Sequence, residues 1–228
     1  MIQRLYIPEK FTNAEVWQIN ISSYLNDNNQ IEMLLNEEEK RRAKRYIHLA
    51  DRIRFIKVRS ALRTLLGQHL LCSPQDICFE IGAFGKPLLH PKFNSHFKSL
   101  FFNVSHSKDY ALIALSEKGE VGIDIEYCHA SLDIYPLAEI VLTHAEYQSI
   151  LTSSNPTHLF FRYWVGKESL LKALGLEIGK HLKHIALYPR ESEGYDFFIE
   201  KPIENLKNKT FSVYQLNVIE NYVAALTC

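Results

Sequence analysis

Residues 121–126 read Val-Gly-Ile-Asp-Ile-Glu, an alternation of apolar and acidic residues that is typical of a half-buried β-strand. Successive side chains of a strand point to opposite faces, so Asp124 and Glu126 leave the same face. Two adjacent carboxylates repel each other unless a cation lies between them, and Mg²⁺ prefers such oxygen ligands. The stretch predicts a strand with a candidate magnesium site. A solvated strand face with two ordinary acids is the alternative for the stretch taken alone.

The chain on both sides of this strand predicts an α+β protein. Helices are expected from Asn36, at about 51–71 and at 156–174, and shorter ones at 134–140 and 145–151. The order of helices followed by strands occurs twice, which suggests two similarly built halves, residues 1–117 and 118–228. Further strands are expected at 77–81, 100–104, 110–115, 184–188, 195–199, 210–214 and 222–226.

Composition excludes several classes of protein. The 228 residues include 26 basic and 26 acidic ones, so no overall charge favours nucleic acid or a membrane as partner. No apolar run approaches membrane-spanning length, and residues 1–4 lack the order of a signal peptide. The four cysteines lack metal-site spacing and are expected to be free thiols. We therefore expect a cytoplasmic protein.

A second acidic motif, Trp164-Val165-Gly166-Lys167-Glu168-Ser169-Leu170-Leu171-Lys172, lies on the predicted helix 156–174. Glu168 and Lys172 are four residues apart and share a helix face, so a surface ion pair would explain them in isolation. Their position inside the apolar stretch 160–174 argues against that explanation. Brought to the strand at 121–126, this face would place a carboxylate and an ammonium beside a metal site, as chemistry on a pyrophosphate requires.

Two other segments offer ligands for phosphate. Asn103-Val104-Ser105-His106-Ser107 is expected where a strand ends in a turn, so its hydroxyl and imidazole can donate to an anion. A turn stabilised by its own Asn and Ser side chains is the alternative. Gly85-Lys86-Pro87 places a lysine on a constrained turn, although a plain hairpin turn with an exposed lysine fits equally well.

The predicted helix 51–71 has a basic side. Its arginines and lysines are most simply explained as a solvated face. Arg54 is the residue that could instead bind an anionic ligand, because the guanidinium fork matches phosphate oxygens.

Taken together and in this order, these segments resemble the Sfp-type 4′-phosphopantetheinyl transferases over roughly residues 36–190. The motifs that carry the resemblance are Asp51-x-x-Arg54 with Arg59 and Arg63, Gly85-Lys86-Pro87, Asn103-Val104-Ser105-His106-Ser107, Gly122-Ile123-Asp124-Ile125-Glu126 and Trp164-x-x-Lys167-Glu168-x-x-x-Lys172.

The resemblance implies two α+β halves related by a pseudo-twofold axis, with coenzyme A bound in the cleft between them. It implies Mg²⁺-dependent transfer of phosphopantetheine from coenzyme A to a serine of an apo acyl or peptidyl carrier protein, with release of adenosine 3′,5′-bisphosphate. The pathway that the carrier serves stays open between fatty-acid, polyketide, nonribosomal-peptide and another synthesis. A monomer is expected, with no nucleic acid or membrane as partner.

The resemblance also implies roles for single residues. Asp124, Glu126 and Glu168 would bind the magnesium, and the catalytic residues would be Asp124, Glu168 as base for the carrier serine and Lys172 as partner of the leaving bisphosphate. The residues expected to contact coenzyme A are Arg54, Ser105 and His106 at the 3′-phosphate, Lys86 near the nucleotide phosphates, Lys167 near the leaving group, and Arg42 as a further phosphate contact, with Arg45 as the alternative to Arg42.

Two other functions use the same residues. A metal-dependent phosphodiesterase would activate water with these carboxylates and would need no carrier protein. A non-catalytic coenzyme A or nucleotide-binding module would not depend on Asp124 or on Mg²⁺.

Overall fold

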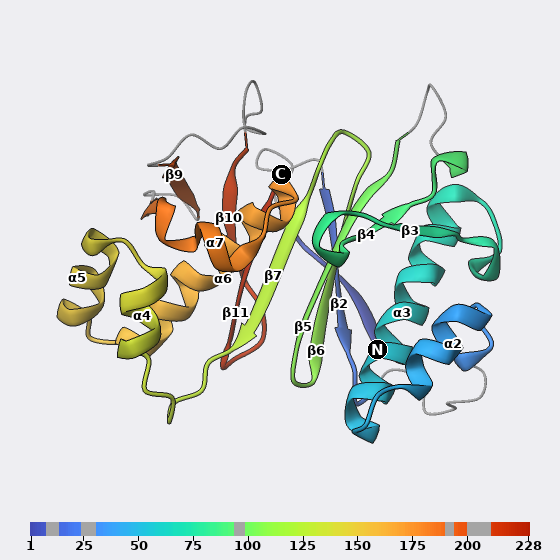
Figure 1. Ribbon diagram of the computed structural model, residues 1–228, viewed down its shortest axis with the longest axis horizontal. Helices are drawn as coiled ribbons and strands as arrows, with labels where there is room; N and C mark the ends of the chain where they lie inside the picture. The colour runs from blue at the N-terminus through green and yellow to red at the C-terminus, as the bar shows by residue number, and fades with distance from the viewer. Residues whose placement is uncertain (8–13, 24–30, 94–98, 190–193, 200–210) are drawn as a thin grey trace.

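The computed structural model describes residues 1–7, 14–23, 31–93, 99–189, 194–199 and 211–228, which form two antiparallel sheets with helices on their outer sides (Figure 1). The first part of the chain contains β1 (Ile2–Leu5), β2 (Ala14–Asn20), α2 (Glu37–Lys44), α3 (Leu49–Leu70), β3 (Phe79–Ile81), β4 (Pro87–Leu89), β5 (Phe101–Ser107) and β6 (Tyr110–Ser116), with 3₁₀ turns at Pro74–Asp76, Ala83–Gly85 and Pro91–Phe93. The second part contains β7 (Gly122–Tyr127), α4 (Tyr135–Val141), α5 (His144–Thr152), α6 (Pro156–Leu174), α7 (Ile178–His181), a 3₁₀ turn at Leu182–His184, β8 (Ile185–Pro189), β9 (Tyr195–Ile199), β10 (Val213–Leu216) and β11 (Tyr222–Thr227).

The two sheets meet at the edge strands β5 and β7. The first sheet has the strand order β1-β2-β6-β5 and the second has the order β7-β11-β10-β9-β8, while β3 and β4 form a separate hairpin. β5 and β7 lie side by side near the middle of the molecule (Figure 1). The α+β class expected from the sequence is confirmed.

Local signals in the sequence explain where the helices begin and end. Asn36 Oδ1 accepts a hydrogen bond from the Glu39 backbone N–H, and the Asn36 backbone N–H donates to the Glu39 carboxylate, which completes a capping box for α2. Thr143 and Glu146 form the same motif at the start of α5. α6 ends at Gly175, whose φ of 67° is the left-handed conformation that glycine adopts most easily.

Three apolar clusters hold the layers together. α3 packs on the first sheet through residues such as Leu62, which lies in one cluster with Ile113 of β6. α6 packs on the second sheet, where Leu171 shares a cluster with Val223 of β11. A third cluster joins the two sheets and includes Leu112, Ala114, Ile123, Ile125 and Ala224. Burial of these side chains fixes the position of β7 between its neighbours.

Two expectations about the first half are wrong. β1 and β2 precede α2, so the order of helices followed by strands does not hold there. The basic side of α3 is not a solvated face, because Lys57 donates to the Ile21 carbonyl at 2.8 Å and Arg63 donates to Glu39 Oε2 at 2.7 Å, both from buried side chains. The strand expected at 210–214 begins at Val213, and residue 210 lies outside the described residues.

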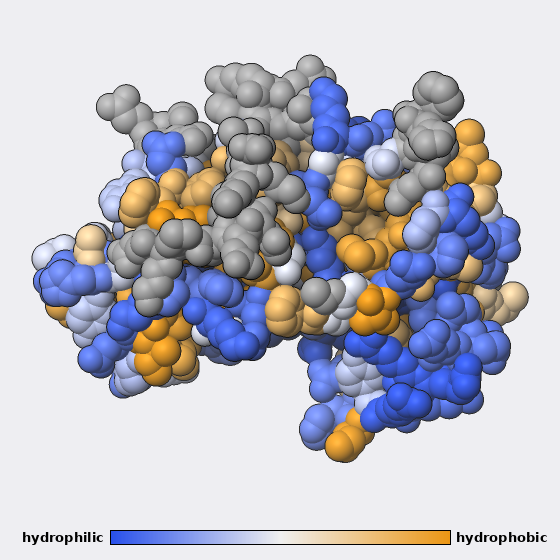
Figure 2. All heavy atoms as spheres, turned by 45° about the horizontal axis from the view of Figure 1, so that its top comes forward, coloured by the Kyte–Doolittle hydropathy of each residue, from blue (hydrophilic) through white to orange (hydrophobic). Residues whose placement is uncertain are grey.

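The surface differs between the two sides of the molecule. Hydrophilic residues cover much of the end formed by α2 and α3, and hydrophobic surface lies in the hollow near the middle (Figure 2). Among the residues that the structure describes, no helix has the length and apolar character needed to span a bilayer.

Candidate active site

Asp124 and Glu126 lie on the face of β7 that is turned toward α6. Their neighbours Ile123 and Ile125 point the other way into the core between the sheets. Asp124 is itself buried, with 1% of its surface exposed, and Glu126 is half-buried. A solvated strand face therefore does not describe these two acids.

A glycine on β7 allows α6 to approach closely. A Cβ at Gly122 would lie 2.0 Å from the Ser169 carbonyl oxygen, which leaves no room for a side chain. At this distance α6 brings Lys172 Nζ within 2.5 Å of Asp124 Oδ1 and within 3.3 Å of Glu168 Oε2. The side chains of Glu168 and Lys172 are 12% and 20% exposed, so they do not form a surface ion pair.

The third element of the site is β5. This strand extends to Ser107, so the segment 103–107 lies within the strand and not in the turn expected from the sequence. Ser105 Oγ donates to Asp124 Oδ1 at 2.7 Å and also lies 3.4 Å from Lys172 Nζ. Ser107 Oγ donates to Glu126 Oε2 at 2.8 Å. β5 therefore contacts both carboxylates of β7 through side chains.

The environment of these groups shifts their pKa values. Burial and then the nearby Asp124 carboxylate raise the pKa of Glu168 to about 7. The same two causes raise the pKa of Glu126. Burial alone would lower the pKa of Lys172, but the carboxylates of Asp124 and Glu168 outweigh this effect and raise it. The ammonium is therefore charged, and it is shared among carboxylates that still repel one another.

The donor set fits a divalent cation. Three carboxylates face one ammonium, and the buried Asp124 Oδ2 has no hydrogen-bond partner within the described part of the chain. In those same residues, no three acidic, histidine or cysteine side chains are arranged to hold a metal ion by themselves. Mg²⁺ commonly takes one or two protein carboxylates and completes its shell with substrate phosphates and water. A cation shared with a phosphate ligand agrees with both observations.

Arg54 and His106 lie on neighbouring elements of the first half. Arg54 Nε donates to the Lys108 carbonyl at 3.1 Å, and its guanidinium pairs with Asp51. Desolvation and the charges of Arg54 and Lys172 lower the pKa of His106. Burial is the larger cause of this lowered pKa, and the two cations add to it, so the neutral imidazole lies beside two positive charges.

Lys86 approaches the site from the hairpin side. Its Nζ donates to the Lys172 carbonyl at 2.8 Å and pairs with Glu120 at 3.2 Å. A pocket of about 420 Å³ opens beside it, lined also by Phe84 and Pro87. Lys86 is thus half-buried between the two halves and is not an exposed turn lysine.

The structure does not bring Lys167 to the carboxylate site. Its side chain is fully buried, and its ammonium donates to Glu146 Oε2 at 2.6 Å and to the carbonyls of Val141 and Leu182 at 3.0 Å. These bonds connect α6 with α4, α5 and the turn before β8. We therefore correct the expectation that Lys167 contacts coenzyme A, because its charge is neutralised inside the protein.

Arg42 is exposed on α2, where its guanidinium carbon lies 5.2 Å from the centre of the Phe55 ring. Arg59 lies over the same ring at 5.8 Å. The ring thus holds two cations near the start of α3.

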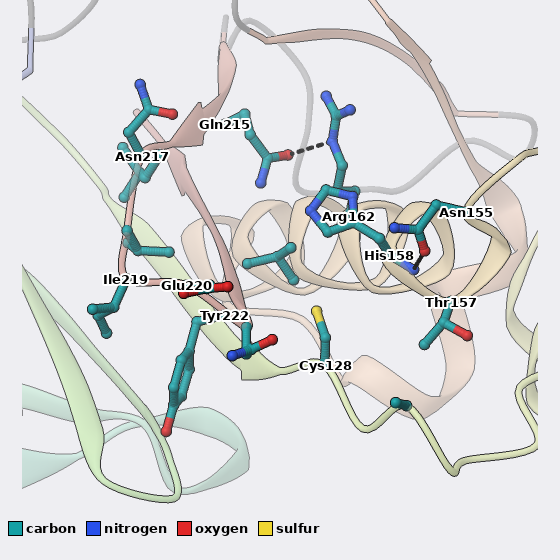
Figure 3. Close-up of a pocket in the computed structure, with 15 residues that line it drawn as sticks. Cys128, Asn155, Thr157, His158, Arg162, Gln215, Asn217, Ile219, Glu220 and Tyr222 are labelled. Carbon is teal, nitrogen blue, oxygen red and sulfur yellow. Dashed lines mark hydrogen bonds between the residues drawn. The ribbon is translucent and has the colours of Figure 1, made fainter.

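A separate pocket of about 740 Å³ lies beside the first turns of α6 and the β10–β11 turn (Figure 3). Arg162 Nε donates to Gln215 Oε1 at 3.3 Å on one side of it. Burial and then the charge of Glu126 raise the pKa of Cys128 to about 11, which favours the protonated thiol over the thiolate at neutral pH. None of the predicted catalytic residues lines this pocket.

Two residues of the site received no role from the sequence. Ser107 binds Glu126, and Asn103 Oδ1 accepts a hydrogen bond from the Ile123 backbone N–H at 2.9 Å. The signal that could have found them is the period of two that places residues 103, 105 and 107 on one face of a strand. It was missed because the segment was expected to leave the strand.

Sequence comparison identifies related proteins for both halves. Residues 17–118 match the family described as "4'-phosphopantetheinyl transferase, N-terminal", and residues 120–227 match the "4'-phosphopantetheinyl transferase superfamily". The 4'-phosphopantetheinyl transferase HetI of Nostoc sp. is 32% identical over 200 residues, which are 84% of this chain and 84% of that protein.

More distant similarities cover less. The L-aminoadipate-semialdehyde dehydrogenase-phosphopantetheinyl transferase of Xenopus laevis is 30% identical over 65% of this chain, and the match spans about half (52%) of that protein. The crystal structure of a holo-[acyl-carrier-protein] synthase from Thermotoga maritima is 19% identical with a TM-score of 0.40, over 47% of this chain and 61% of the other.

Proposed function

Because the chain belongs to the 4′-phosphopantetheinyl transferase family, we propose that it transfers phosphopantetheine from coenzyme A to a serine of an apo acyl or peptidyl carrier protein. The observation that carries the proposal is the buried Asp124, which Lys172 and Ser105 bind on one oxygen while the other lacks a partner in the described residues. Together with Glu126 and Glu168, such a carboxylate could bind a divalent cation that also contacts the pyrophosphate of coenzyme A.

The reaction exchanges one phosphorus–oxygen bond for another. The carrier serine oxygen bonds to the phosphorus that bears pantetheine, and the bond from that phosphorus to the bridging oxygen breaks. Adenosine 3′,5′-bisphosphate leaves with the bridging oxygen and its electron pair. The serine proton passes to a base of the enzyme.

Glu168 is our candidate for that base, directly or through water. A general base works best when its pKa lies near the pH of the reaction, and burial raises the pKa of Glu168 to about 7. Lys172 lies one helical turn further, 3.3 Å from Glu168. Its ammonium would offset the negative charge of the leaving bisphosphate.

Asp124, Glu126 and Glu168 would hold the magnesium. When bound, Mg²⁺ would offset charge on the pyrophosphate oxygens and orient them. The support comes from the raised pKa values of Glu126 and Glu168, which reflect burial and an excess of negative charge at this junction.

The nucleotide contacts belong mainly to the first half of the chain. We assign Arg54, Ser105 and His106 to the 3′-phosphate and Lys86 to the neighbouring phosphates. Arg42 is a further candidate contact on α2. The pocket beside Lys86, with walls of Phe84 and Pro87, would take an uncharged part of coenzyme A.

Each half supplies part of the site within one chain. The boundary at 117/118 falls between β6 and β7, and β5 from before this boundary contacts β7 from after it. We therefore propose a monomer that acts in the cytoplasm, with coenzyme A and a carrier protein as its partners and neither nucleic acid nor a membrane among them.

Coenzyme A consumption tests the proposed reaction against hydrolysis. Purified protein is incubated with coenzyme A and Mg²⁺, with and without an apo carrier protein, and the nucleotide products are separated by chromatography. A transferase releases adenosine 3′,5′-bisphosphate only when the apo carrier is present. Release at equal rates without carrier would instead support a phosphodiesterase.

A further inference from the structure

Ser107 lies on β5 beside Glu126 and is held there from two sides. Its Oγ accepts a hydrogen bond from the Tyr127 backbone N–H at 3.1 Å and donates to Glu126 Oε2 at 2.8 Å. A serine hydroxyl has a single proton. Because a backbone donor occupies its acceptor side, that proton is directed at the carboxylate, and the orientation of the hydroxyl is fixed.

The same relationship occurs two residues earlier on both strands. Ser105 donates to Asp124 as Ser107 donates to Glu126, although β5 and β7 belong to different sheets. The period of two along each strand sets this match between hydroxyls and carboxylates. The two serine hydroxyls of β5 thus each bind one acidic side chain of β7.

Glu126 needs such a restraint more than Asp124 does. Asp124 has a short side chain that Lys172 and Ser105 both bind. Glu126 has one more rotatable bond, is only half-buried and is repelled by the Asp124 carboxylate, which contributes to its raised pKa. The Tyr127 backbone N–H also hydrogen-bonds Glu126. Loss of the Ser107 hydroxyl would leave the Glu126 side chain with one donor fewer and a weaker restraint on its rotation.

We propose that Ser107 is a positioning residue that holds Glu126 in the orientation in which it binds the divalent cation. This inference rests on the proposed function, in which Glu126 is a magnesium ligand. Groups that hydrogen-bond a metal-binding carboxylate fix its direction, and their loss typically lowers metal affinity by about 10-fold to 100-fold.

Two β-branched variants of nearly equal shape isolate the hydroxyl. Ser107→Thr keeps it and Ser107→Val removes it, and Ser107→Ala repeats the removal with a smaller side chain. Mn²⁺ serves as the probe, and its binding to the full chain saturated with coenzyme A is measured by the electron paramagnetic resonance signal of free Mn²⁺. Ser116→Ala, which removes a buried hydroxyl at the far end of β6, is the matched control.

We expect Ser107→Val and Ser107→Ala to bind Mn²⁺ about tenfold more weakly or worse, and Ser107→Thr and Ser116→Ala to stay close to wild type. The Ser107→Val and Ser107→Ala variants should regain turnover of carrier protein at high Mg²⁺, because a weakened metal site can be saturated. A general loss of structure would not be reversed in this way. Equal affinity of the Val and Thr variants would overturn the inference.

A parallel Asp124→Ala variant separates the role of Ser107 from the proposed metal site. If it abolishes Mn²⁺ binding while the Ser107 variants bind normally, only the role of Ser107 is refuted. If it leaves Mn²⁺ binding unchanged, the proposed metal site fails and the role of Ser107 fails with it.

Discussion

Lys172 Nζ lies 2.5 Å from Asp124 Oδ1 and ties α6 to β7 where the two sheets meet. The same ammonium lies 3.3 Å from Glu168 Oε2, so one positive charge serves two carboxylates. Asp124 is the closer partner of the ammonium. The ammonium therefore does not fully offset the effects of burial and of the Asp124 carboxylate on Glu168. Burial, and then the Asp124 carboxylate, raise the pKa of Glu168 to about 7 although the ammonium opposes both effects.

Glu168 should make the metal-free protein less stable as pH rises. Its pKa is about 7 in the folded chain against an ordinary value of 4.5, so the folded state binds more protons within that window. The contribution of Glu168 to stability is therefore fully present below pH 4.5 and is lost as the pH rises through about 7. In thermal denaturation with a chelator, the Tm of wild type should fall relative to Glu168→Gln between these values and run parallel above them.

The exposed Glu38→Gln variant is the control, and its Tm should follow wild type at every pH. Parallel Tm curves for wild type and Glu168→Gln through the whole window would contradict the assignment of a raised pKa to Glu168.

Lys167→Met should destabilise the fold by about 3–5 kcal/mol, because it leaves the buried Glu146 carboxylate without its ammonium partner. The double variant with Glu146→Gln should cost less than the sum of the two single changes. Urea denaturation measures both. The folded Lys167→Met protein should bind coenzyme A within about twofold of wild type, and a large loss of affinity without loss of stability would restore Lys167 as a ligand contact.

The helices were more predictable from the sequence than the strands. Caps such as Asn36, Thr143 and Gly175 depend on neighbouring residues only, so they can be read locally. β1 and β2 were missed because the adjacent apolar residues Val16 and Trp17 break the alternation in 14–20, and because short strands gain their stability from partners that are distant in the chain. β2 pairs with β6, for example Ile19 with Ala111.

Only part of the site was predictable, because only some of its residues are related by a pattern within one helix or strand. Asp124 could be paired with Glu126 because both lie on one face of a strand. Glu168 could be paired with Lys172 because they are four residues apart on a helix. The contacts between elements could not be read in this way. Lys167 and Glu168 are adjacent on α6, yet helix geometry turns one into the core and the other to the site.

Arg54→Ala should weaken coenzyme A binding by about tenfold or more, since hydrogen bonds to a charged group contribute about 1.5–3 kcal/mol. Dephospho-coenzyme A, which lacks the 3′-phosphate, provides the control ligand. Calorimetry should show that wild type and Arg54→Ala bind it with similar affinity. An equal loss for both ligands would place Arg54 elsewhere on the substrate.

Gly122→Ala should cost about 3 kcal/mol or more, because its Cβ would meet backbone atoms of α6 that cannot rotate away. Gly119→Ala is the matched control, since a Cβ there meets no atom within 4 Å. Chemical denaturation should separate the two variants clearly. Equal stability would mean that α6 and β7 are not packed as closely as the site requires.

We propose that Asp124, Glu168 and Lys172 form a transferase site that acts on a carrier serine. The most direct measurement is the intact mass of a panel of apo carrier proteins after incubation with this protein, coenzyme A and Mg²⁺. We expect one added phosphopantetheine on at least one carrier, located at a serine, and no addition with Asp124→Ala or Glu168→Gln. Unchanged carrier masses across the panel while coenzyme A still binds, or normal modification by Asp124→Ala, would contradict it.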